Sequence, residues 1–266
     1  MEQKYLNNKA TTTAYGKAIV YKNPRIIEKP TNFGEIRTIV FVDVIVAGKN
    51  VPGQERLKSL TRLQFTGKLA EKAKSLTVNE LINWVGLPYL SISKNETTLT
   101  NYKILTYDVT AFSAVQILKN ETDYNIVLDS TYTKVQTIAR LLENPIELTN
   151  NTCLRTCFNV QNSEKGIFID IFTGDKINNI FNYEDFQNIK KGAKIYLTFR
   201  PFATSSFSEK TQENYVESKA EMLNYFLVEA PFESTIQTNS QAYEAKVEIE
   251  EEDNNKEQIA NMFNFE

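Results

Sequence analysis

Histidine is absent from the 266 residues of this chain. Histidine is the side chain that titrates nearest neutral pH, and it is the commonest general base and metal ligand. Its absence excludes Ser-His-Asp and Cys-His catalysis and zinc proteases that carry a His-Glu-x-x-His motif. Magnesium chemistry on carboxylates is the catalytic class that composition leaves open.

Cysteine and glycine are scarce, with 2 and 9 residues respectively. Cys153 and Cys157 supply only two of the four ligands that a structural zinc site needs, so we expect both to be reduced residues of a core or a sheet edge. The glycines never form the phosphate-binding runs of dinucleotide-binding or P-loop proteins. The sequence therefore predicts neither an enzyme nor a bound cofactor or metal.

Long apolar runs are also missing. No stretch approaches the ~18 apolar residues that a membrane-spanning helix requires, and the first residues lack the apolar core of a signal peptide. We therefore expect a cytoplasmic protein without a membrane partner. Apolar residues still make up 41% of the chain, with 16 Phe and 13 Tyr, which is enough for two domains of the usual ~100 to 200 residues.

Charge is unevenly distributed. Residues 236–266 hold eight acidic residues against two lysines, a net charge of −6, which leaves +3 for residues 1–235 because the whole chain carries −3. Such a segment is typical of a disordered acidic tail. Its tip carries Met262, Phe263 and Phe265, and exposed apolar groups of this kind favour a partner-binding role.

Two segments share an alternating pattern typical of β-strands. Residues 40–44 read VFVDV and residues 167–171 read IFIDI, with Phe and Asp on the face opposite the β-branched residues. A second similarity joins FTG at 65–67 with FTG at 172–174. The two similarities imply different offsets, so the sequence predicts two copies of one β module and leaves their register open.

Each copy is followed by a predicted helix. In the first copy the helix spans 77–85 and begins with a capping box from Thr77 to Glu80, and in the second copy the helix is capped by Asn182. Each helix precedes a predicted strand pair, 87–93 with 101–109 and 194–202 with 222–229. Strands, one short helix and a hairpin follow one another in this order in a five-stranded OB-fold barrel.

The predicted fold class is mainly β, with two tandem OB-fold modules (five-stranded Greek-key barrels) that carry short capping helices. The predicted organisation is an N-terminal extension over 1–35, a first module over 36–120, a connector over 121–148, a second module over 149–235 and the acidic tail over 236–266. Within the connector, residues 125–128 are predicted as a strand and residues 135–142 as a helix.

A protein that holds unpaired strands without reading sequence needs cations for the phosphates and exposed rings for base stacking. Both residue types alternate on the predicted outer faces of the strands. Residues 202–220 are predicted as a flexible finger that extends the outer face of the second module. The candidate DNA-binding residues are Arg37, Phe41, Arg62, Gln64, Lys68, Lys103 and Tyr107 in the first module, and Lys194, Tyr196, Arg200, Phe202 and Phe207 in the second.

The segment 65–76, FTGKLAEKAKSL, resembles the strand-to-helix turn of bacterial single-stranded DNA-binding proteins. The acidic tail with its aromatic tip resembles the partner-docking tails of that family and of its phage counterparts. The resemblance implies a tandem-OB phage or plasmid protein that coats single-stranded DNA during replication or recombination. It also implies that replication or recombination proteins dock on the tail.

Two other functions stay open. One is a β-rich structural or assembly protein of a virus, whose aromatic residues would be buried in subunit contacts. The other is a magnesium-dependent nuclease built on Asp43, Asp170 and Glu71. Binding of an oligo-dT strand separates the first alternative from a DNA-coating protein, and cleavage in the presence of magnesium tests the second.

Overall fold

The computed structural model describes residues 12–31, 33–48, 58–149, 151–160, 166–173, 186 and 189–229. Strands dominate these residues, and the predicted mainly-β class is confirmed. The elements are β1 (Thr13–Val20), β2 (Arg25–Pro30), β3 (Ile36–Ala47), β4 (Lys58–Thr66), α1 (Gly67–Ala73), β5 (Glu80–Asn95), β6 (Thr100–Ile117), α2 (Glu121–Asp129), β7 (Tyr132–Leu141), β8 (Ile146–Glu147), β9 (Thr152–Phe158), β10 (Ile167–Phe172), β11 (Lys194–Ser208) and β12 (Glu213–Glu229).

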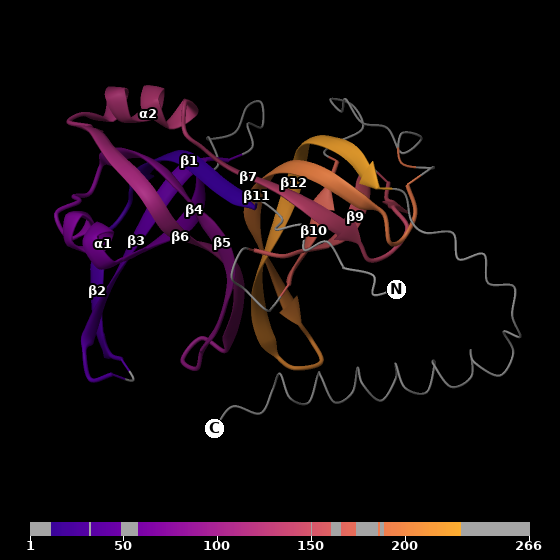
Figure 1. Cartoon of the computed structure of the whole chain (residues 1–266), viewed down its shortest axis with the longest axis horizontal. Helices are drawn as coiled ribbons and strands as arrows, with labels where there is room; N and C mark the ends of the chain where they lie inside the picture. The colour runs from indigo at the N-terminus through magenta and orange to yellow at the C-terminus, as the bar shows by residue number, and fades with distance from the viewer. Residues whose placement is uncertain are drawn as a thin grey trace, which may run out of the picture. The chain divides into compact units, whose positions relative to one another are not determined.

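The first module is a closed barrel in the order β3-β4-β6-β5-β1 (Figure 1, indigo to magenta). The barrel closes where β1 pairs with β3, at Ile19 opposite Ile45 and Val20 opposite Val44. Strand β4 runs parallel to β6, while β3 with β4 and β5 with β6 are antiparallel. This strand order, with one parallel pair, is that of the OB fold.

The second module repeats the topology of the first (Figure 1, magenta to yellow). Its strands follow the order β7-β11-β12-β10-β9, and pairing of β7 with β9 closes it. Its parallel pair, β10 with β12, corresponds to β4 with β6. The predicted pair of tandem OB-fold barrels is therefore confirmed.

Alternate positions of each strand point into the barrels, because successive side chains of a strand point to opposite faces. In the first barrel Val40, Val42 and Val44 of β3 are fully buried. In the second barrel the inward positions of β11 and β12 are filled in the same way. The buried side chains there include Ile195, Leu197, Phe199, Ala220 and Met222.

The two barrels are joined through their first strands. β1 pairs antiparallel with β7, from Thr13 opposite Gln136 to Lys17 opposite Tyr132. β5 and β11 occupy the other edges of these strands, so one sheet runs through β5-β1-β7-β11. A β-carbon on Gly16 would lie 2.5 Å from the backbone oxygen of Tyr132. The absence of a side chain at Gly16 thus permits the close approach of the two barrels.

The structure corrects the module boundaries. The N-terminal extension expected over 1–35 contains β1, and the connector expected over 121–148 contains β7, which are the first strands of the two barrels. The predicted secondary structure of the connector was wrong in both places. Residues 125–128 lie in helix α2 and residues 135–142 overlap strand β7.

The helix predicted over 77–85 was also wrong, because β5 already begins at Glu80 and the helix of this module is α1. The capping contact does form, since the Thr77 N–H donates to Glu80 Oε2 at 2.9 Å. Asn79 then turns the chain with a φ of 65°. A capping-box sequence therefore marks a tight turn here.

The structure decides the register of the repeat. Strand β3 is the second strand of its barrel and β10 is the third, so residues 40–44 and 167–171 are not equivalent. Phe65 and Phe172 do lie near the ends of the equivalent strands β4 and β10. Phe65 is fully buried and Phe172 is half-buried, so the two rings occupy different faces. Gly174 and Asn182, used in the second copy, lie outside the described residues.

Candidate nucleic-acid interface

The outer face of β3 and β4 carries a ring beside paired charges. Phe41 lies opposite Gln64 in this strand pair, and the Arg25 guanidinium lies over the Phe41 ring at 5.1 Å from its centroid. One step along, Arg62 Nε and Nη2 donate to the two carboxylate oxygens of Asp43 at 2.7 and 3.2 Å. The hydrogen bonds to Asp43 raise the pKa of Arg62. On this face the Phe41 ring is thus partly covered by Arg25, and the charge of Arg62 is neutralised by Asp43.

Tyr89 of β5 extends this face. Its hydroxyl donates to Gln64 Oε1 at 2.8 Å, and burial raises its pKa to about 12. The hydroxyl thus stays protonated at neutral pH and holds the Gln64 amide in one orientation. Neither Tyr89 nor Arg25 was among the residues predicted from sequence, although Tyr89 follows Pro88 in an alternating strand.

The equivalent face of the second barrel is formed by β9 and β10. Arg155 lies opposite Asp170, with Nε and Oδ1 3.6 Å apart, and it also donates to Glu143 Oε1 at 3.2 Å. Phe168 is 54% exposed on this face, and Lys219 lies over the Phe172 ring at 5.6 Å. One exposed ring and one half-buried ring accompany the paired charges on this barrel.

The shared sheet β5-β1-β7-β11 carries a second group of rings and cations. Tyr15 and Tyr132 meet edge to face, with ring centroids 6.2 Å apart, and Lys134 lies over the Tyr132 ring at 5.2 Å. Tyr196 packs against Phe226 at 6.1 Å, and burial raises the pKa of Tyr15. Of the residues on this sheet, only Tyr196 and Lys194 were predicted from sequence, because β1 and β7 were not recognised as strands.

The structure separates the predicted DNA-binding residues into several places. Phe41, Arg62 and Gln64 share the β3–β4 face. Arg37 is exposed near the start of β3, opposite Lys29 of β2. Lys194 and Tyr196 lie on the shared sheet. Arg200, paired with Glu221, and Phe202, opposite Lys219, lie near Phe172 instead. Two hairpins carry Lys103 and Phe207, and α1 carries Lys68.

The prediction for Tyr107 was wrong. Its ring is 1% exposed and packs against Trp84 inside the first barrel, with centroids 4.8 Å apart. Leu105 and Val109 share its face of β6 and are also buried, so the period of two in this strand indicates an inward ring. Lys103 has the same parity but is exposed, because β6 there extends beyond the barrel as a hairpin.

The stretch predicted as a flexible finger is an ordered β-hairpin. Strands β11 and β12 continue through it to Ser208 and Glu213, with Phe207 opposite Asn214. Phe207 is 55% exposed. The tail residues Met262, Phe263 and Phe265 lie outside the described residues.

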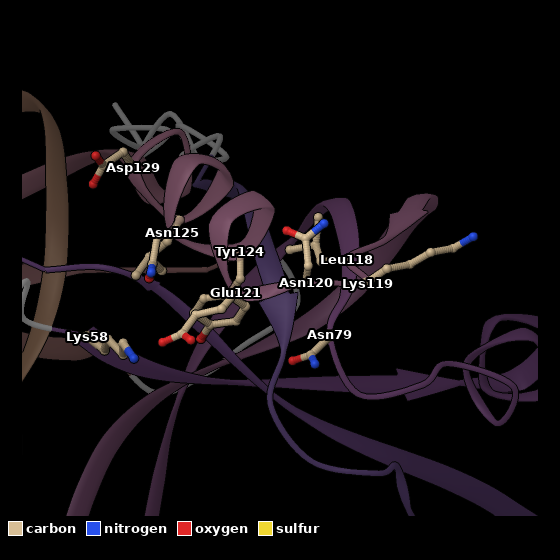
Figure 2. A pocket seen from close by; sticks show the side chains of 10 residues that line it. Lys58, Asn79, Leu118, Lys119, Asn120, Glu121, Tyr124, Asn125 and Asp129 are labelled. Carbon is tan, nitrogen blue, oxygen red and sulfur yellow. The ribbon is translucent and has the colours of Figure 1, made fainter.

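A hollow of about 630 Å³ lies beside α2, away from these faces. In Figure 2, Tyr124 and Glu121 project from α2 toward Lys58, whose ammonium lies over the Tyr124 ring at 5.4 Å. The lining mixes both charge signs, and none of the predicted DNA-binding residues contributes to it. The hollow therefore adds nothing to the interface.

The described residues contain no group of three acidic or cysteine side chains placed to hold a metal ion. Both cysteines are free, and burial raises the pKa of the Cys153 thiol to about 11. Of the two helices in the described ranges, neither is long and apolar enough to cross a membrane.

No protein-family model matches the chain, and no curated protein matches it. Two solved structures of the single-stranded DNA-binding protein from Thermus aquaticus are similar. A deletion variant aligns with a TM-score of 0.54 at 14% identity, over 86% of this chain and 99% of that one. The wild-type protein aligns with a TM-score of 0.52 at 14% identity, over 87% and 98%. The fold is shared. Because the alignment spans most of both chains, the likeness extends over both barrels.

Proposed function

We propose that this chain binds single-stranded DNA without strong sequence preference and protects it during phage or plasmid replication or recombination. The observation that carries the proposal is the repeated arrangement of half-buried rings and cations on the outer faces of both barrels, Phe41 with Arg25 and Phe172 with Lys219. Base stacking on such rings is sequence-tolerant because every base has a π-face. The fold shared with the Thermus aquaticus protein supports the same proposal.

The cations support single-stranded rather than duplex DNA as the ligand. Duplex binders generally need a strongly basic domain, whereas residues 1–235 carry a net charge of only +3. Several cations on the outer faces are also neutralised by partners, as Arg62 is by Asp43. Stacking therefore has to supply much of the affinity, and only unpaired bases offer their faces for it.

The acidic tail is proposed to have two roles. It competes with DNA for the cationic faces when no strand is bound, and it recruits replication or recombination proteins through Met262, Phe263 and Phe265 when a strand is bound. The proposed setting is the cytoplasm of the host cell, and the proposed action involves no catalysis.

The test is fluorescence anisotropy of a labelled oligo-dT strand, titrated at several salt concentrations beside a duplex of equal length. We expect binding of the single strand that weakens with salt, weaker binding of the duplex and no cleavage with magnesium. Absence of single-strand binding would refute the proposal and favour the assembly alternative. A form ending at Thr235 should bind more tightly, and equal affinity at every salt concentration would refute the competition role.

A further inference from the structure

The β5–β6 and β11–β12 hairpins, one from each barrel, are paired with each other. Residues Thr100–Lys103 of β6 run parallel to Asn214–Glu217 of β12, with their backbones in register. The Asn214 N–H donates to the Leu99 carbonyl oxygen at 2.9 Å, and the Leu105 N–H donates to Ser218 Oγ at 2.8 Å. The two hairpins thus form one continuous surface, which we call the paired hairpins.

Glu213 is the centre of the side-chain contacts between these hairpins. Its carboxylate accepts a hydrogen bond from Asn101 Nδ2 at 2.9 Å and pairs with Lys94 Nζ at 3.2 Å, and both donors belong to the other hairpin. The Tyr215 hydroxyl of its own strand donates to it at 3.1 Å. The Asn101, Lys94 and Tyr215 hydrogen bonds lower the pKa of Glu213. A single carboxylate therefore links the two barrels at their hairpin tips.

An exposed ring and exposed cations also lie on the paired hairpins. Phe207 is 55% exposed, and Lys103 and Lys210 are exposed as well. In an OB fold the loop between the fourth and fifth strands helps to bind oligonucleotides, and that loop is the tip of each of these hairpins. An acidic residue at this place repels phosphate, so electrostatics alone gives no reason for its presence.

We propose that Glu213 is a positioning residue, which holds the two hairpins together as one platform for a single strand that crosses from one barrel to the other. The inference rests on the proposed function. Fixing the hairpins before binding removes an ordering cost that the DNA would otherwise have to meet. Lys94 is accordingly engaged by Glu213 and does not contact phosphate.

The sign of one substitution separates positioning from electrostatics. If Glu213 acts only through its charge, Glu213→Ala tightens binding of oligo-dT. If it positions the hairpins, Glu213→Ala weakens binding by about two- to tenfold, the scale of leaving one or two side chains to be ordered on binding. The matched control is Glu209→Ala, which removes the same charge from the β11–β12 turn. Within the described residues the Glu209 carboxylate has no partner, so this control should bind equally or more tightly.

Amide hydrogen exchange measures the pairing without DNA. Glu213→Ala should speed exchange of the Asn214 and Leu105 amides, while Glu209→Ala should not. If exchange changes as expected but neither the parent protein nor any variant binds oligo-dT, the proposed function fails and the pairing role of Glu213 survives. If the parent protein binds and Glu213→Ala binds as tightly as Glu209→Ala, the positioning role is overturned.

A disulfide offers a rescue. Tyr102 lies opposite Val216 in the parallel register, and neighbouring strands lie about 4.8 Å apart, within the range that a disulfide spans. In the Glu213→Ala background, Tyr102→Cys with Val216→Cys should recover affinity when oxidised and lose it when reduced. Peptide mapping should show that the new pair is oxidised and that Cys153 and Cys157 are not. Equal affinity in the two redox states of the mapped protein would overturn the positioning role.

Discussion

On the first barrel the acid of the central cross-strand ion pair, Asp43, belongs to the second strand and its partner Arg62 to the third. On the second barrel Arg155 belongs to the second strand and Asp170 to the third. The two faces thus keep an ion pair between the same two strands and exchange its charges. A cation that served to bind phosphate would be expected on the same strand in both barrels. Because the cation changes strand, these pairs indicate cross-strand stabilisation of the face.

Each barrel also has a ring with a cation above it, and the ring lies on the second strand of the first barrel but on the third strand of the second barrel. Arg25 covers Phe41 on the first barrel, and Lys219 covers Phe172 on the second, while Phe168 has no such cover among the described residues. Arg25 and Lys219 come from strands that flank the ion pairs. Under the proposed function these rings are candidate stacking sites for bases, with Phe168 the least covered of them, and the ion pairs fix the strands that carry them.

The largest expected effect is at the junction of the two barrels, where a substitution in β1 is compared with one in β7. Gly16 of β1 lies opposite Thr133 of β7, and an added β-carbon at Gly16 would come within 2.5 Å of a backbone oxygen and 2.8 Å of Trp84 Nε1. Gly16→Ala should therefore lower the free energy of unfolding by about 3 kcal/mol, the upper part of the usual range for overpacking. Urea denaturation measures the change.

Thr133→Ala is the matched change on the other barrel. The Thr133 hydroxyl is buried without a hydrogen-bond partner within the described residues, so its removal should cost little stability. Equal losses for Gly16→Ala and Thr133→Ala would show that the close approach at Gly16 does not hold the junction.

The next effect concerns the two outer faces. Phe168→Ala should weaken oligo-dT binding by about 1 to 2 kcal/mol, because stacking on an exposed ring is worth roughly that much for each base. Phe41→Ala should cost less, since the Arg25 guanidinium already covers part of that ring. Anisotropy titrations of both variants at one salt concentration give the comparison. A larger loss for Phe41→Ala would assign the main stacking site to the first barrel.

Much of the fold could be predicted from strand patterns in the sequence, and the failures have physical causes. Strands β3, β10 and the two long hairpins have regular alternation of apolar and polar residues. In β7 the buried positions include the polar residues Thr133 and Thr137, so the apolar residues do not follow the period of two of a strand. The remaining apolar residues, Val135, Ile138 and Leu141, have the spacing of a helix. In α2 the Ile-Val-Leu run imitates a strand, whereas the Asn120 side chain caps a helix by accepting from the Asp123 N–H at 2.8 Å.

The candidate site was predicted in part for similar reasons. Phe41, Arg62 and Gln64 alternate with apolar residues, so their outward direction could be read from the strands. Tyr89 and Arg25 reach the same face from β5 and β2, and no local pattern shows which strands become neighbours. One signal was available and unused: Tyr15-Gly-Lys17 and Tyr132-Thr-Lys134 occupy equivalent places in the first strands of the two barrels. This repeat would have located β1 and β7.

The smallest expected effect tests the exchanged ion pairs. Asp43→Asn frees Arg62, which has no second acidic partner within the described residues, and should tighten oligo-dT binding by up to about fivefold, the scale of one surface ion pair. Asp170→Asn should tighten it less, because Arg155 keeps its contact with Glu143 at 3.2 Å. If Arg62 gains a phosphate, the slope of log affinity against log salt steepens by about 0.7. Weaker binding by Asp43→Asn would mean that the ion pair positions the ring-bearing face, and that its loss costs more than the freed charge contributes.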